Sequence, residues 1–239
     1  MAEQFEMMRS TLDGMCFTPG ACSFSIGRAK KDSKAYALSV FRRKLPAAAH
    51  NFYQVFDGPG TTLSQVELIL KGVDIPAADP QICRIISHYG QAARRLFELI
   101  EENQFRGDFE DFSAVGRILT GEVFLIPEAH GALRFLKSVC KDQKEYALCC
   151  FIYLLKMGKD FPAAPYAASL FLNALLVSSG WYPVILHGRD APEFKTRMLE
   201  FERDGNADGV LHFFELMVRR DTERHRRFSQ DFSWKKKII

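Results

Sequence analysis

The segment that most constrains the fold is residues 151–186, in which two long apolar stretches flank a short polar break. It reads FIYLLKMGKDFPAAPYAASLFLNALLVSSGWYPVIL. Helices that are apolar on every face belong in the interior of a protein. The longest apolar stretch, Ala163 to Val177, contains Pro165 and Asn173 and is shorter than the roughly 20 residues that span a bilayer. We therefore expect two buried core helices and no transmembrane segment.

The rest of the chain predicts a helical protein, because its apolar residues recur with a period near 3.6. The expected helices, besides the stretch after the break, are residues 34–50, 62–71, 80–103, 109–119, 127–139, 146–157, 190–203 and a last one from 210 into the basic region beyond 219. Strand-like sequence is limited to residues 122–126 and 183–186. The fold class expected is all-α, a helical bundle with at most one short β-hairpin.

Local signals set the expected boundaries. Residues 1–27 carry no sustained period and are expected to be irregular. Pro46 is expected to interrupt a helix or to begin the next one, and Asp190 with Glu193 forms a plausible capping pair. We divide the chain into an N-terminal extension packed on the core (residues 1–45), a helical domain (46–220) and a basic C-terminal tail (221–239).

Composition excludes several classes of protein. Hydrophobic residues make up 47% of the 239 residues and charged residues 26%, which is ordinary for a soluble domain. A net charge of +3 is too small to indicate nucleic-acid binding. The six cysteines have no CxxC spacing, and the N-terminus does not resemble a signal peptide. We expect a cytoplasmic protein with reduced thiols, although an effector secreted without a classical signal peptide would pass the same test.

The two apolar stretches and the Gly-Trp-Tyr-Pro that follows them resemble the core of the Fic/Fido family, whose members transfer AMP or related groups to protein hydroxyls. Three further segments fit the family in order: residues 126–161, residues 190–217, and residues 51–72, which are similar to its inhibitory helix and the helix after it. The resemblance covers roughly residues 46–220. It implies a Fic-like helical bundle.

The catalytic motif of that family, His-x-Phe-x-Asp/Glu-Gly-Asn-Gly-Arg-x-x-Arg, is missing. Aligned without gaps from Asn173, its functional positions are occupied by Gly158, Pro162, Ala163, Ala164, Pro165, Tyr166 and Ser169. Glycine in place of the histidine cannot act as a general base. Pro162, in place of the acidic residue, has no side-chain ligand for Mg²⁺. Pro165 removes a backbone donor from the phosphate loop, and neither arginine remains to pair with phosphate. We expect no catalytic residue of the family type, no metal and no cofactor.

Two other family features are altered. The segment available for the β-hairpin that docks the target, Thr120 to Ile126, is too short for two strands. In the inhibitory segment, Asp57 and Gly58 stand where Glu-Gly is expected. With no arginine at Tyr166, we expect this acidic residue to have no partner on the motif helix and to mark only a helix end and turn.

Four residues are candidates for binding in the cleft that the resemblance implies. Lys159 and Asp160 are the charged residues of the break, although solvation of an exposed turn is the simpler explanation for them. Tyr166 could stack on a base or could simply pack at a helix start. His187 follows an apolar segment near the expected cleft, where a structural role is the alternative.

These observations favour a catalytically degenerate Fic-fold protein (a pseudoenzyme) that acts through protein binding or regulation, as a bacterial effector or regulator. The alternative is a transferase of altered chemistry that uses ATP with Mg²⁺ or a nucleotide sugar. A third hypothesis is an antitoxin or regulator of an active Fic partner. A protein partner is expected, no specific nucleic acid is expected, and a homodimer is left open.

Overall fold

Helices form almost all the regular structure of the computed structural model, which describes residues 2–20, 33–76, 78–122, 128–217 and 220. They are α1 Ala2–Thr11, α2 Ser33–Phe56, α3 Leu63–Leu70, α4 Pro80–Glu101, α5 Phe109–Thr120, α6 Ala129–Val139, α7 Gln143–Met157, α8 Ala164–Ser178, the 3-10 turn η1 Gly188–Asp190 and α9 Ala191–Asp204. Residues 208–217 form a further helix. Within these ranges there is no strand, although Cys16 and Asn206 form an isolated bridge. The predicted all-α fold class is confirmed.

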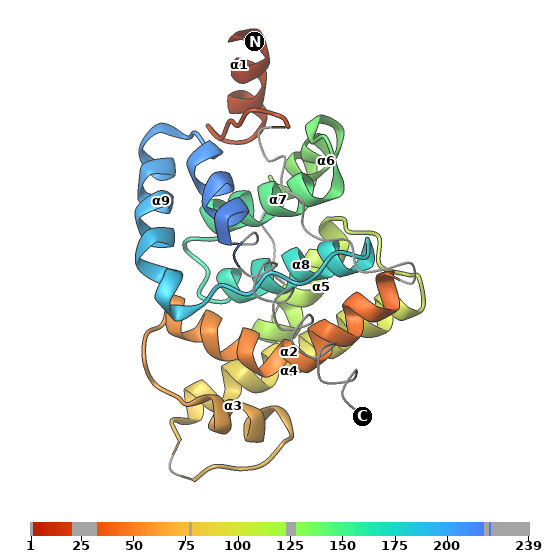
Figure 1. The fold of residues 1–239 in the computed structure, drawn as a ribbon, viewed down its shortest axis with the longest axis vertical. Coiled ribbons are helices and arrows are strands. Elements are labelled where there is room, and N and C mark those ends of the chain that lie inside the picture. The colour runs from red at the N-terminus through yellow and green to blue at the C-terminus, as the bar shows by residue number, and fades with distance from the viewer. Residues whose placement is uncertain (1, 21–32, 77, 123–127, 218–219, 221–239) are drawn as a thin grey trace, which may run out of the picture.

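The two apolar helices α7 and α8 lie in the interior, as their sequence predicts. Helix α8 packs against α7, α2, α4 and α5, so it is enclosed from several sides (Figure 1). From Tyr166 to Val177 every residue of α8 is buried, including the polar Ser169 and Asn173. Burial on all faces explains why this helix shows so little amphipathic character.

The other helices wrap this centre. Helices α2 and α4 contact each other and α8, and α6 contacts α7. Figure 1 shows α1 at one end of the molecule and α3 at the opposite end, with α9 along one side. No helix in the described ranges has both the length and the apolar character needed to cross a bilayer.

Two expectations near the N-terminus were wrong. Residues 2–11, expected to be irregular, form α1, although this helix fully buries only Met8. Helix α2 continues through Pro46, which was expected to interrupt it. A proline inside a helix costs about 3 kcal/mol, and buried residues on both sides of it, from Phe41 to Phe52, supply packing that outweighs this cost. The domain division at residues 45 and 46 therefore falls within one helix and stays a prediction.

The cap expected at Asp190 is also absent. Its side chain makes no capping hydrogen bond to α9. Instead the buried carboxylate of Asp190 binds Arg220 at 2.8 and 2.9 Å. A partner distant in sequence has displaced the local bond that the Asp-x-x-Glu pattern indicated. By contrast, Thr62 does cap α3, in a reciprocal arrangement with Gln65.

Some predictions fall outside the described residues. They are the strand-like segment at 123–126, the basic C-terminal tail at 221–239 and the thiol of Cys22. The other five cysteines are free thiols, as expected.

Candidate functional site

The break between α7 and α8 is a chain of tight turns. The N–H of Gly158 donates to Leu154 O at 2.9 Å and closes the last turn of α7. The N–H of Phe161 then donates to Gly158 O at 2.8 Å, and that of Ala164 to Phe161 O at 2.9 Å. These bonds satisfy the backbone locally and hold the start of α8 against the end of α7.

Gly158, where the sequence analysis placed the motif histidine, has no room for a side chain. A Cβ atom there would lie 2.3 Å from Ala164 Cβ and 2.7 Å from Leu154 O. Real Cβ atoms do not approach other atoms this closely, and neither neighbour is the flexible end of a long side chain. The close contact of the two helices at this point therefore depends on glycine.

The start of α8 offers few free donors to an anion. The N–H of Ala164 is already bonded to Phe161, and Pro165 has no N–H at all. No side chain caps this helix. A helix N-terminus binds phosphate through its unpaired N–H groups, so two of the relevant donors are missing here.

Tyr166, in the first turn of α8, is hydrogen-bonded to Asp57. Its side chain is 4% exposed, and its hydroxyl donates a hydrogen bond to Asp57 Oδ2. Asp57 comes directly after Phe56, the last residue of α2. The next residue, Gly58, has a left-handed conformation with φ of +91°. The helix end and turn predicted at residues 57 and 58 are present. The expectation that Asp57 has no partner on the motif helix was wrong, because a tyrosine hydroxyl meets it there.

A buried polar chain continues from Tyr166 along α8. The Ser169 hydroxyl donates to Tyr166 O at 2.8 Å and lies 3.5 Å from the hydroxyl of Tyr89. The Tyr89 ring makes an edge-on contact with that of Tyr166, at 6.3 Å between centroids. Asn173 donates to Ser169 O at 3.0 Å and accepts from Val184 N at 2.7 Å. Tyr166 and Ser169, where the sequence analysis placed the two motif arginines, thus carry hydroxyl groups with partners inside the protein.

The remaining candidate residues lie apart from this chain. Lys159 and Asp160 are exposed, together with Phe161 and Pro162. His187 is half-buried, and its Nδ1 lies 3.3 Å from Asn51 Nδ2 on α2. The structure therefore joins Tyr166 to Asp57 and His187 to α2, and it leaves Lys159 and Asp160 on the surface.

Burial raises the pKa of three groups at this site. Burial raises the pKa of Asp57 above its ordinary value. Burial also raises the pKa of Tyr53, and the nearby Asp57 carboxylate adds to the shift. Burial raises the pKa of Tyr89 strongly, so this hydroxyl stays protonated. In the described part of the chain, no three His, Cys, Asp or Glu side chains are grouped so that they could hold a metal ion.

Sequence patterns missed the partner residues of this site. Tyr89 falls on the apolar face of α4 and reads as an ordinary core residue, and nothing in the sequence pairs it with Ser169. The polar Ser169 and Asn173 within an apolar helix were the available signal, because polar groups in such a helix need partners.

Comparison with known proteins identifies the architecture. No protein-family model matches the chain, and no curated protein matches it in sequence. Two solved structures of a fragment of Fic-1 from C. elegans, one of them a single-residue variant, are similar in fold at a TM-score of 0.66. Each alignment covers 96% of this chain and 74% of the Fic-1 chain, at 16% sequence identity. At that identity the likeness concerns the fold, and on this basis the chain has a Fic/Fido fold.

Proposed function

We propose that this chain is a Fic-fold pseudoenzyme, which has lost AMP transfer and acts by binding another protein. The observation that carries the proposal is the state of the break between α7 and α8. Gly158, aligned with the catalytic base, has no space for a side chain. Tyr166 and Ser169, aligned with the two arginines, are buried and carry hydroxyl groups. Each of these features removes a separate requirement of phosphoryl transfer.

The residues present do not fit a magnesium–nucleotide complex at this place. Pro162 has no side-chain oxygen to bind the ion, and Mg²⁺ requires oxygen ligands. Fewer backbone N–H groups are available to phosphates, because Pro165 has none and that of Ala164 is bonded to Phe161 O. Asp57, which follows α2 and binds Tyr166, would repel a phosphate. We therefore derive no catalytic step through a nucleotide.

The exposed part of the break supports a role in protein binding. Lys159, Asp160 and Pro162 are all exposed, and the Phe161 side chain beside them is 41% exposed. Backbone hydrogen bonds on either side hold the main chain of this turn. Aromatic side chains are enriched at contacts between proteins, and Phe161 is the aromatic side chain of this turn.

Ligand binding tests the pseudoenzyme proposal against the alternative transferase. Thermal unfolding is measured with ATP, GTP, CDP-choline, UDP-sugars and dTDP-sugars, each with and without Mg²⁺. A ligand at 100 times its Kd stabilises the native state by about 2.7 kcal/mol. For a chain of this size that corresponds to roughly 5–10 °C in Tm. We expect no shift of that size, and such a shift with any donor would favour the transferase instead.

Substitutions at the break test the binding surface. Once a partner has been identified by crosslinking and purified, Lys159→Ala with Asp160→Ala is expected to weaken its binding to this chain. Lys195→Ala with Glu202→Ala is a matched control, because both residues are exposed on α9 and the net charge is unchanged. Both double variants are expected to keep the wild-type Tm. Equal affinity of wild type and the break variant would exclude the break from the interface.

A further inference from the structure

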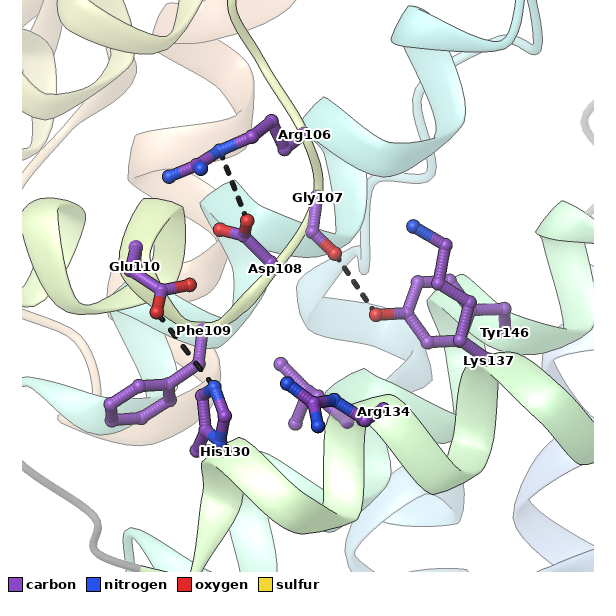
Figure 2. A pocket seen from close by; sticks show the side chains of 10 residues that line it. Arg106, Gly107, Asp108, Phe109, Glu110, His130, Arg134, Lys137 and Tyr146 are labelled. Carbon is purple, nitrogen blue, oxygen red and sulfur yellow. Dashed lines mark hydrogen bonds and ion pairs between the residues drawn. The ribbon is translucent and has the colours of Figure 1, made fainter.

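A cavity of about 430 Å³ lies at the opposite end of α7 from the break. It is bounded by the start of α5, one face of α6 and Tyr146 in the first turn of α7 (Figure 2). Helix α7 rises about 1.5 Å per residue, which separates this cavity from the break by roughly 20 Å. The cavity is therefore a different site from the one described above.

One wall of this cavity, residues 106–108, is rigid. The buried carboxylate of Asp111 accepts hydrogen bonds from the N–H groups of Arg106 and Gly107, at 2.7 and 2.8 Å. The Tyr146 hydroxyl donates to Gly107 O at 2.9 Å. Gly107 itself has φ of +66°, and a Cβ atom there would lie 2.5 Å from Leu175. A wall fixed on three sides does not need to be ordered when a ligand binds.

Asp108 and Glu110, the acidic side chains that line the cavity, each have a basic neighbour. Asp108 pairs with Arg106 at 3.1 Å and also accepts the N–H of Asp111. Glu110 lies 3.8 Å from His130. Figure 2 shows both pairs as dashed lines.

The opposite wall carries two cations without such partners. Arg134 and Lys137 stand one turn apart on α6 and are both exposed. Neither makes an ion pair with any residue in the described ranges, whereas Arg106 across the cavity pairs with Asp108. In Figure 2 the Arg134 guanidinium reaches into the space between His130 and the turn at Gly107, and Lys137 lies beside Tyr146.

We propose that this cavity binds a small molecule through a phosphate or carboxylate group held by Arg134 and Lys137. The planar guanidinium of Arg134 suits two oxygens of one such group, and Lys137 adds a second positive charge. Leu133 and Phe109 supply apolar surface for the rest of the molecule. The volume falls within the range of about 300–1,000 Å³ that small-molecule sites occupy. This site is independent of the function proposed for the break.

Titration by two-dimensional NMR tests the site. Inorganic phosphate, glycerol 3-phosphate and succinate are added separately at constant ionic strength, with glycerol as the uncharged control. We expect saturable shifts of the Gly107 amide and of the Arg134 side-chain signal with at least one anion and none with glycerol. Preference for the phosphates or for succinate identifies the anionic group, and either preference supports the site.

Two double variants distinguish this site from general attraction to a basic surface. Arg134→Gln with Lys137→Gln is expected to weaken binding by about tenfold or more, because it removes two charge-assisted contacts. Arg117→Gln with Lys195→Gln removes the same charge from exposed positions outside the cavity and is expected to bind as the wild type does. Absence of saturable shifts in the wild type, or equal weakening by both double variants, would overturn the proposal.

Discussion

The hydrogen bond between Tyr166 and Asp57 predicts an unequal cost for removing its two partners. Tyr166→Phe deletes the hydroxyl and leaves Asp57, whose carboxylate reaches solvent and regains water. Asp57→Ala deletes the acceptor and leaves a phenolic hydroxyl on a side chain that is only 4% exposed. A buried donor without a partner costs more than a bond whose two ends are both removed.

The magnitudes follow from burial. Hydrogen bonds to charged groups contribute about 1.5–3 kcal/mol, but burial already raises the pKa of Asp57, so part of this gain is spent on desolvation. We expect Tyr166→Phe to lower the free energy of unfolding by about 1 kcal/mol, and Asp57→Ala by about 2 kcal/mol. The corresponding decreases in Tm are about 2–4 °C per kcal/mol.

The double variant measures the coupling directly. Once the hydroxyl is gone, deleting the carboxylate leaves no buried group unpaired, so the double variant should be about as stable as Tyr166→Phe alone. Urea unfolding gives the free energies, and an unchanged slope of stability against urea shows that the unfolded state is the same. Asp57→Asn, which keeps an acceptor oxygen, is the matched control and should cost less than Asp57→Ala. Simple additivity of the two single changes would refute the argument, because it would mean that the groups do not interact.

Three further outcomes are expected. Gly158→Ala should lower the free energy of unfolding by about 1–3 kcal/mol through overpacking, since its Cβ would collide with Ala164; a wild-type urea midpoint would show that the helices can separate there. Asn173→Ala should cost about 1–3 kcal/mol, because it leaves Val184 N–H without its acceptor, and Asn173→Asp, which keeps an oxygen, should recover part of the loss at pH below the pKa of the new carboxyl. The raised pKa of Asp57 means that the folded state binds this proton more tightly; its stabilising contribution is complete below the unfolded pKa of about 3.9 and is lost as pH rises through the folded pKa. The stability of wild type relative to Asp57→Asn should therefore decline as pH rises above about 4, and parallel pH profiles would contradict this sign.

The sequence predicted the helices well where periodicity and end signals agreed. Pro80 begins α4 and Thr62 caps α3, because these residues act through their own backbone neighbours. Predictions from local signals were wrong at Asp190, which does not cap α9, and at Pro46, which does not interrupt α2. Asp190 binds Arg220 from a distant part of the chain, and the packing of α2 outweighs the proline in its middle.

For the candidate site, the sequence by itself determined which chemical groups are available. It fixed that no histidine, metal-binding carboxylate or arginine pair of the Fic motif is present at residues 158–169. Only the tertiary structure decided what replaces them, because the partners of Tyr166 and Ser169 come from α2 and α4. A sequence pattern reports neighbours within a few residues, whereas the closed packing at Gly158, the Asp57 contact and the cavity beside Arg134 depend on helices that meet in space.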